Sequence, residues 1–215
     1  VQGKDVYVWD DYAYVAAYYD GLCIISVANP QRPEIVGYCD TPGIAWAVTV
    51  SGEFAYVVNW SGGLSIISVA NPQHPEEVTY YGDWLSGSRD VAIIGDYAIV
   101  ANEYSGLRVI SIEDPENPEQ VDDLVGSFLS IAVSDHCAFV LNDRSGLSIF
   151  ALDNLPQIRE IGRCETHVQG KDVYVWDDYA YVAAYNGGLQ IISVANPRRP
   201  ERVGFCDTEG NSNAV

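Results

Sequence analysis

The chain has 215 residues, of which 48% are hydrophobic, and its 30 acidic and 11 basic residues give a formal net charge of −19. This length allows one domain with a substantial core, whereas the charge opposes binding to nucleic acid or to an anionic membrane, since both require clustered Lys and Arg. No segment has the length and hydropathy of a transmembrane helix.

Four short runs of β-branched and aromatic residues, each ended by turn residues, make up the first repeat. They cover residues 5–9, 12–17, 22–27 and 34–39. Pro30 and Pro33 separate the last two runs, because proline fixes φ and offers no N–H to a strand ladder. No run has the period or length of a helix, so we predict four antiparallel strands.

The same pattern recurs five times along the chain. A Gly-Leu pair opens the third run of each repeat, at Gly21, Gly63, Gly106, Gly146 and Gly188. Four strands in about 40–45 residues are typical of a β-propeller blade. We predict an all-β fold with a single β-propeller domain over residues 1–208, with four-stranded antiparallel blades at approximately 1–41, 42–84, 85–126, 127–166 and 167–208.

The repeats are not equally alike. Residues 168–208 differ from residues 1–41 at only six positions, and residues 209–215 resemble residues 42–48, as if a further repeat began there. We expect a chain that starts and stops inside an array with a period of four repeats. The five blades close as a ring, or they form part of a larger ring or open array, for example of eight blades. We favour five blades in this chain, and an unclosed array would promote homo-oligomers through its exposed strands.

The segment Ala13–Gly37, AYVAAYYDGLCIISVANPQRPEIVG, resembles the LVIVD repeat family, and the resemblance extends over essentially the whole chain. It implies a β-propeller of the kind found in bacterial and archaeal proteins that are often secreted or on the cell surface. An extracellular, cell-surface or periplasmic location is therefore expected. The resemblance implies no shared set of catalytic residues.

Candidate ligand-binding residues follow from the order of the strands. If the first run is the innermost strand, then the residues before it and those after the second run lie together at the channel mouth. Aromatic rings beside amides and charges at such a site suit a sugar or a peptide. The candidates are Tyr18, Trp46, Asn59, Trp60, Arg89, Asp90, Asn102, Glu103, Asn142, Asp143 and Tyr185. Trp46 and Trp60 are the least repeated, whereas Trp9 and Trp176 lie within strands and are expected to pack.

A basic residue followed by Asp recurs before the first strand, at Lys4-Asp5, Arg89-Asp90 and Lys171-Asp172. Because a feature that repeats with the fold usually supports it, we expect these carboxylates to accept N–H groups of neighbouring loops, with the cations offsetting their charge.

The sequence lacks a catalytic constellation. His74, His136 and His167 are in non-equivalent positions without metal-ligand spacing, and no phosphate-binding loop or nucleophile elbow is present. We predict no catalytic residues, no metal ligands and no cofactor. The favoured function is a non-catalytic extracellular or cell-surface scaffold that binds protein or glycan or builds an assembly.

Two alternatives remain. A glycoside hydrolase would use paired carboxylates at the channel mouth, drawn from Asp5, Asp90, Glu103, Asp143 and Asp172. A scaffold stabilised by Ca²⁺ would bind it near Asp10-Asp11 and Asp177-Asp178.

The five cysteines do not form a disulfide framework. Their number is odd, and Cys39, Cys164 and Cys206 occupy one position in different repeats, too far apart to bond. We expect buried free thiols. The fourth repeat departs from the Asn-Pro turn at residues 153–156, where we expect an irregular turn.

Overall fold

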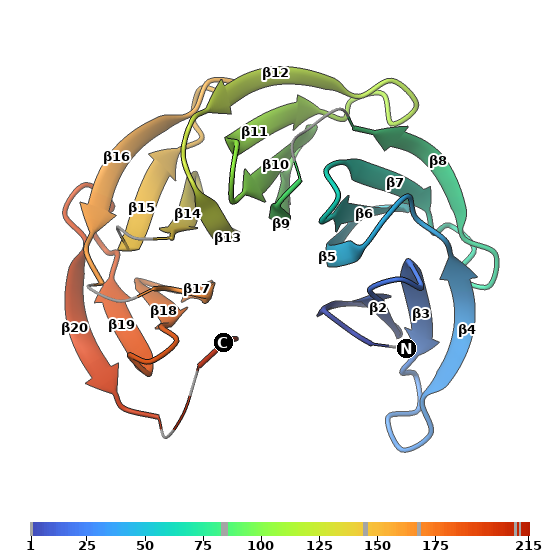
Figure 1. The fold of residues 1–215 in the computed structure, drawn as a ribbon, viewed down its shortest axis with the longest axis horizontal. Helices are drawn as coiled ribbons and strands as arrows, with labels where there is room; N and C mark the ends of the chain where they lie inside the picture. Colours follow the sequence, from blue (N-terminus) through green and yellow to red (C-terminus); the bar gives the residue numbers. More distant parts are fainter. Residues whose placement is uncertain (1, 83–85, 144–145, 167–168, 209, 211) are drawn as a thin grey trace. The chain divides into compact units, whose positions relative to one another are not determined.

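A computed structural model describes residues 2–82, 86–143, 146–166, 169–208, 210 and 212–215. Within these ranges it contains 20 strands and no helix, and the strands form five four-stranded antiparallel sheets (Figure 1). Neighbouring strands of each sheet follow one another in the chain. The predicted all-β class and the repeat of four antiparallel strands are therefore confirmed. His167 lies outside the described residues.

The strands have nearly the same limits in every repeat. The first sheet contains β1 (Asp5–Trp9), β2 (Tyr12–Ala16), β3 (Leu22–Ser26) and β4 (Glu34–Cys39), and the second contains β5 (Ala45–Ser51), β6 (Phe54–Asn59), β7 (Leu64–Ser68) and β8 (Glu76–Tyr81). The third contains β9 (Ser88–Ile94), β10 (Tyr97–Asn102), β11 (Gly106–Ser111) and β12 (Glu119–Leu124). The fourth contains β13 (Phe128–Ser134), β14 (Cys137–Asn142), β15 (Gly146–Ala151) and β16 (Arg159–Cys164), and the fifth contains β17 (Asp172–Trp176), β18 (Tyr179–Ala183), β19 (Leu189–Ser193) and β20 (Glu201–Cys206).

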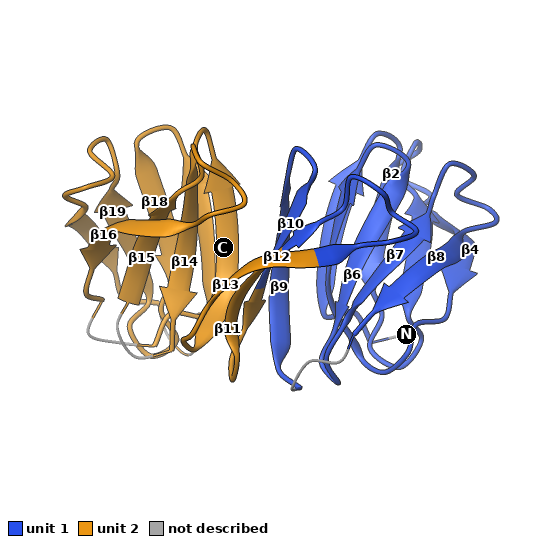
Figure 2. Ribbon diagram, turned by 90° about the horizontal axis from the view of Figure 1, so that it is seen from above, with its two compact units in different colours: residues 1–100, 110–119 blue, residues 101–109, 120–215 orange. Residues whose placement is uncertain are grey.

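The chain divides into two compact units (Figure 2). Unit 1 comprises residues 1–100 and 110–119, and unit 2 comprises residues 101–109 and 120–215. The first two sheets belong to unit 1, the last two to unit 2, and strands of the third sheet contribute to both.

Apolar side chains between successive sheets form the cores. In unit 1, Tyr14 and Ile24 of the first sheet pack with Val48 and Val57 of the second. A second cluster joins the opposite side of the second sheet to residues of β9, β10 and β11. In unit 2, one cluster joins the fourth sheet to the fifth. The second sheet is thus apolar on both sides, as expected for a stacked blade.

A column of small residues permits this close packing. The second residue of the second strand is an alanine that is at most 8% exposed in every repeat: Ala13, Ala55, Ala98, Ala138 and Ala180. A large residue follows it, and it is almost fully buried in four repeats: Tyr14, Tyr56, Ile99 and Phe139. Small and large buried residues thus follow one another in the second strand of these repeats.

The recurring glycine is explained by a close approach between strands. Gly21 has φ of +69°, and a Cβ atom there would lie 2.3 Å from the carbonyl oxygen of Cys39. Gly146 has φ of +90°, and its Cβ atom would lie 2.4 Å from the carbonyl oxygen of Cys164. Only glycine combines the left-handed conformation with contact to the fourth strand.

The first strands of neighbouring sheets lie next to each other. β1 contacts β5 and β5 contacts β9 in unit 1, and β13 contacts β17 in unit 2. Within each unit, the residues at the beginning of these first strands are consequently brought close to their equivalents in the next sheet.

The C-terminal segment makes the same backbone contacts with the fifth repeat as the beginning of the second repeat makes with the first. The N–H of Ala45 donates to the carbonyl oxygen of Tyr18 at 2.9 Å, and the N–H of Ser212 donates to that of Tyr185 at 3.0 Å. Both pairs are also isolated antiparallel bridges. Ser212 therefore pairs with Tyr185 of the fifth repeat in the same way as Ala45 pairs with Tyr18 of the first.

Two smaller predictions have different outcomes. The turn of the fourth repeat is irregular, as predicted: the Leu155–Pro156 peptide bond is cis, and the N–H of Gln157 donates to the carbonyl oxygen of Asn154. The expected packing of Trp9 and Trp176 is wrong. They are 44% and 64% exposed, because they end β1 and β17 beside the turn to the next strand.

All five cysteines are free thiols, as expected, but they are not uniformly buried. Cys23 is buried, whereas Cys206 is exposed. Burial raises the pKa of the Cys23 thiol. The described part of the chain has no helix that is long and apolar enough to cross a membrane.

Candidate ligand-binding surface

The carboxylates that begin the first strands support the backbone. Asp5 accepts the N–H of Val6 at 2.8 Å through one oxygen and that of Val48, in the next sheet, at 2.9 Å through the other. Asp90 likewise accepts the N–H of Val91 at 2.8 Å. These contacts agree with the expectation that such carboxylates accept backbone N–H groups.

Asp172 makes contacts of the same kind in unit 2. It accepts the N–H of Val173 and the hydroxyl of Ser130 through Oδ1, at 2.9 and 3.0 Å, and the N–H of Val215 through Oδ2 at 3.0 Å. The carboxylate therefore connects the fourth sheet, the fifth sheet and the C-terminal segment.

The three asparagines predicted at the ligand site also support the fold. The Asn59 side chain is fully buried and donates to the Ser65 hydroxyl at 3.1 Å. Asn102 is equally buried, and its Oδ1 accepts the N–H groups of Tyr104 and Ser105 at 2.8 and 2.9 Å. The Asn102 amide thus holds the turn between β10 and β11, whereas the Asn59 amide connects β6 to β7 and its buried Oδ1 has no hydrogen-bond partner among the described residues.

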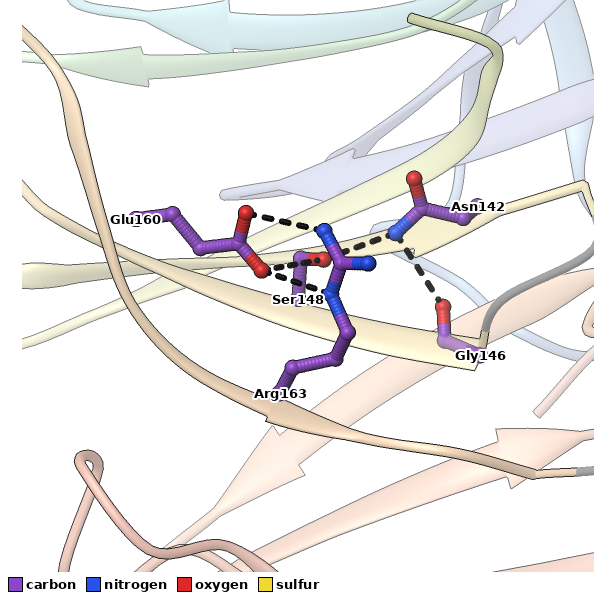
Figure 3. Close-up of polar contacts among 5 residues, drawn as sticks. All are labelled: Asn142, Gly146, Ser148, Glu160 and Arg163. Carbon is purple, nitrogen blue, oxygen red and sulfur yellow. Dashed lines mark hydrogen bonds and ion pairs between the residues drawn. The ribbon is translucent and has the colours of Figure 1, made fainter.

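Asn142 belongs to a hydrogen-bonded chain across the fourth sheet (Figure 3). Its amide nitrogen donates to the Ser148 hydroxyl at 2.8 Å, and that hydroxyl donates to Glu160 at 3.1 Å. Arg163 donates to both oxygens of Glu160, at 2.8 and 2.9 Å. The network runs from β14 through β15 to β16, so the amide is turned into the sheet.

A cation lies over a tyrosine in the first and the fifth repeat. The Lys4 ammonium is 4.6 Å from the centre of the Tyr18 ring, and the Lys171 ammonium is 5.2 Å from that of Tyr185. The residue before the first strand thus meets the residue that follows the second strand, as the predicted strand order requires. Tyr18 also contacts the exposed ring of Tyr19, with centroids 4.2 Å apart.

The second repeat has two indoles at these positions. The Trp46 and Trp60 ring centroids are 5.1 Å apart, with 37° between the ring planes. The Arg89 guanidinium lies 4.3 Å from the centre of Trp60 and 4.9 Å from that of Trp46. Lys4 lies 4.9 Å from the centre of Trp46. Tyr18, Lys4, Trp46, Trp60 and Arg89 form what we call the aromatic–cation row, which lies entirely within unit 1.

The two indoles are held in place without belonging to the core. Both are half-buried, and neither is a member of the apolar clusters of the described residues. The N–H of Trp60 donates to the carbonyl oxygen of Ile44 at 2.7 Å, and its carbonyl oxygen accepts the N–H of Gly87 at 2.8 Å. Large apolar side chains at a fixed, partly solvated position are typical of binding surfaces.

Glu103 and Asp143 occupy the position of Trp60 in the third and fourth repeats. Both are half-buried, and Asp143 accepts a hydrogen bond from the Gln169 amide. No group of three potential metal ligands occurs among the described residues. Asp10 and Asp177, which belong to the aspartate pairs considered as Ca²⁺ ligands, are turn residues with φ of 51° and 48°.

Lys4 is the member of the row that was not among the ligand-binding residues predicted from the sequence. Sequence reasoning assigned it to charge compensation for Asp5, because the Lys-Asp pair repeats. Its position next to Trp46 follows only from the contact between β1 and β5. The available signal was the alternation of basic and apolar residues at the beginning of the first strands: Lys4, Trp46, Arg89, Leu129 and Lys171.

The repeated sheets and their shared contacts define a repeat protein of the β-propeller type. The LVIVD repeat model matches residues 2–41, 42–83, 87–123 and 169–208, and the chain therefore belongs to the LVIVD repeat family. No curated protein matches the chain.

Solved structures with the same fold have little sequence in common with this chain. A computationally designed protein, Ika8, is similar with a TM-score of 0.76 and 7% identity, over 99% of this chain and 64% of its own. The chain thus spans less than two thirds of that structure. A functionally unknown protein from Desulfotomaculum acetoxidans DSM 771 has a TM-score of 0.76 and 14% identity, over 99% of this chain and 73% of its own.

Proposed function

We propose that this protein is a non-catalytic scaffold that binds an extracellular protein or glycan on the aromatic–cation row. The observation that carries the proposal is the Trp46–Trp60 pair, which lies outside the cores with centroids 5.1 Å apart and has a cation near each ring. Paired indoles bury a large apolar area of a partner while adding little conformational entropy cost.

The distribution of roles favours binding over catalysis. The carboxylates that recur with the repeat, such as Asp5 and Asp172, have their oxygens engaged by backbone N–H groups. The row, in contrast, contains residues at which the repeats differ. A surface that varies on a constant framework is the usual way in which repeat proteins acquire partners.

We also propose that the sheets are blades around a common axis, with the first strands innermost and five blades in a ring. The contacts of β1 with β5 and of β13 with β17 support this order within each unit. A larger ring or an open array is the alternative. Monodisperse behaviour in sedimentation velocity would support a closed ring, and concentration-dependent association would favour open ends.

The binding proposal can be tested on a broad glycan and peptide array. The protein is expected to recognise a subset of ligands, and Trp46→Ala/Trp60→Ala should lose them while its unfolding transition is retained. Trp176→Ala is the matched control, because Trp176 is an exposed indole in unit 2, outside the row. An array without hits, or hits that the double variant keeps, would contradict the proposal.

A further inference from the structure

We propose that a groove along β20 receives the Asn29–Pro33 turn of a second copy of this chain, so that copies associate head to tail. This inference goes beyond the proposed ligand binding and does not depend on it. It develops the open array, which is the alternative to a ring of five blades. Three observations carry it: a contact that recurs between successive repeats, an open groove at the equivalent place in the fifth repeat, and an exposed matching turn in the first.

The middle of a fourth strand contacts the turn that precedes the fourth strand of the next repeat. The turn between β7 and β8 lies beside β4 (Figure 1), and a Cβ atom at Gly37 would collide with the carbonyl oxygen of Pro72 and lie 3.1 Å from Cδ of Pro75. In β16, a Cβ atom at Gly162 would collide with the carbonyl oxygen of Pro197. Glycine at these positions therefore lets a proline-containing turn lie directly on the strand.

The two remaining junctions keep this contact with other residues at the glycine position. Thr79 in β8 donates its hydroxyl to the carbonyl oxygen of Glu116 at 3.4 Å. Asp122 in β12 accepts the N–H of Ile158 at 3.0 Å. The contact of a fourth strand with the following turn is thus a general feature of how one repeat meets the next.

The fifth repeat has an open groove at the same place. Gly204 in β20 is equivalent to Gly37 and Gly162, and the nearest atoms to a Cβ atom there belong to Ile191 of its own sheet. A groove of about 420 Å³ lies here, and its lining residues, two of which are more than half exposed, are Arg202, Val203, Gly204 and Phe205. The groove therefore lies where the turn of a following repeat packs at the other junctions.

The first repeat has a turn of the required shape. The Asn29 side chain accepts the N–H of Gln31 at 3.1 Å, and the equivalent bond in the second repeat is 3.2 Å long. Pro30 and Pro33 are exposed, whereas the equivalent prolines of the second and fifth repeats are partly buried. Because the turn is already formed, its docking costs little conformational entropy.

The apolar faces beside the turn and the groove match as well. Tyr181 and Ile191 of the fifth sheet are half-buried, and they are equivalent to Tyr14 and Ile24, which pack on the second sheet. The fifth sheet therefore presents the residues with which the first sheet contacts its neighbour.

The first sheet presents the complementary residues on its other side. Val6 and Val8 are 57% and 60% exposed. Their equivalents in the second sheet, Val48 and Val50, are both 4% exposed, because they pack on the first sheet. A first sheet from a second copy can thus repeat the established junction between the first and second sheets on the fifth. The contact joins two different surfaces, so it can continue from copy to copy.

The C-terminal segment competes with this docking. The N–H of Ser212 donates to the carbonyl oxygen of Tyr185, and that of Val215 donates to Asp172. Ser212 and Val215 are equivalent to residues 3 and 6, so they occupy the places that these residues of a docked copy would take. Docking therefore requires release of these hydrogen bonds, and removal of the segment should favour it.

The test is sedimentation velocity of the whole chain from about 1 μM to about 1 mM at physiological ionic strength, where repulsion from the net charge of −19 is screened over about 8 Å. We expect the mean sedimentation coefficient to rise with concentration. Deletion of residues 212–215 should shift this rise to a concentration at least about tenfold lower. A chain that stays monomeric at every concentration, with and without these residues, would overturn the second copy as occupant.

Two variants each block one surface. Gly204→Val fills the groove, and Val8→Lys places a charge on the face that docks, so each alone should weaken association at least about tenfold. A mixture of the two should form a dimer, because the first variant keeps its first sheet intact and the second keeps its groove. Arg159→Val is the matched control, an exposed strand residue of unit 2 outside the groove, and it should associate like the unmodified chain.

Each outcome decides one part of the proposal. Undiminished association of Gly204→Val, with its circular dichroism unchanged, would overturn the groove as the docking site. A mixture that stays monomeric while the unmodified chain associates would overturn the head-to-tail arrangement. Association is measured without any ligand, so these results are independent of the glycan and peptide array that tests the proposed function.

Discussion

The carboxylate of Asp5 accepts the backbone N–H of Val48 at 2.9 Å, across the contact between the first and the second sheet. Asp172 and Val215 repeat this bond at 3.0 Å, again with a separation of 43 residues. One short side chain thus fixes where the next first strand begins.

Replacement of these two carboxylates should destabilise the protein to different degrees. Asp5→Ala leaves the N–H groups of Val6 and Val48 without this acceptor, and we expect a loss of roughly 1–3 kcal/mol. Asp172→Ala also removes the bond from Ser130 and should cost more. Urea unfolding monitored by circular dichroism checks both, with Asp11→Ala, an exposed turn residue, as control. Equal stability of all three variants would contradict this role.

The hydrogen-bonded chain across the fourth sheet predicts that substitutions of Asn142 and Ser148 change the stability non-additively. Ser148→Ala should cost roughly 1–3 kcal/mol, because it removes the bonds of the hydroxyl to both Asn142 and Glu160. The first repeat has Ala17 and Cys23 at the equivalent positions, and both are buried there. We therefore expect Asn142→Ala/Ser148→Cys to be more stable than Ser148→Ala. A double-mutant cycle of Asn142→Ala and Ser148→Cys, measured by chemical denaturation, gives the coupling free energy between the two residues. Strictly additive losses of stability would contradict this coupling.

Two glycines with positive φ should respond differently to alanine. Gly52 has φ of +59° and open space around its Cβ position, so Gly52→Ala should cost about 1–2 kcal/mol from conformation alone. Gly146→Ala adds the collision with the Cys164 carbonyl, for a further loss of about 1–3 kcal/mol. Thermal unfolding of both variants tests this, and a similar shift in Tm would contradict the close approach.

The cysteines should react in the order of their exposure. Cys206 is exposed, whereas Cys23 is buried and its pKa is raised by burial, so a smaller fraction of it is thiolate at neutral pH. Alkylation of the native protein at pH 8, followed by peptide mass spectrometry, should label Cys206 first and Cys23 last. Labelling of Cys23 before Cys206 would show that β3, which contains Cys23, opens readily.

Tyr56 predicts a loss of stability in alkali. Burial, and to a lesser extent Asp96, raises its pKa above the ordinary value of 10.0. Its hydroxyl is protonated in both states below pH 10, but above that pH the unfolded chain ionises first, so stability falls as pH rises. Tyr56→Phe should reduce the slope of unfolding free energy against pH above 10. An unchanged slope would assign the alkaline loss to other groups.

The sequence predicted the strands because short runs of β-branched and aromatic residues alternate with turn residues, and the glycine spacing defined the repeat. It could not show where polar side chains point. Asn59 and Asn142 look like surface residues at a turn, yet each amide turns inward because a serine six residues later faces it in the neighbouring strand. The contact of Lys4 with Trp46 depends on which sheets are neighbours, which no local pattern encodes.

The separation of 43 residues between Asp5 and Val48, and between Asp172 and Val215, has an evolutionary consequence. Each bond reaches one repeat ahead, so duplicating a whole repeat within the gene supplies a new acceptor and a new donor together. Copy number can therefore change without compensating substitutions at existing junctions. The near-identity of residues 1–41 and 168–208, which are four repeats apart, is what duplication of a block of four whole repeats would leave.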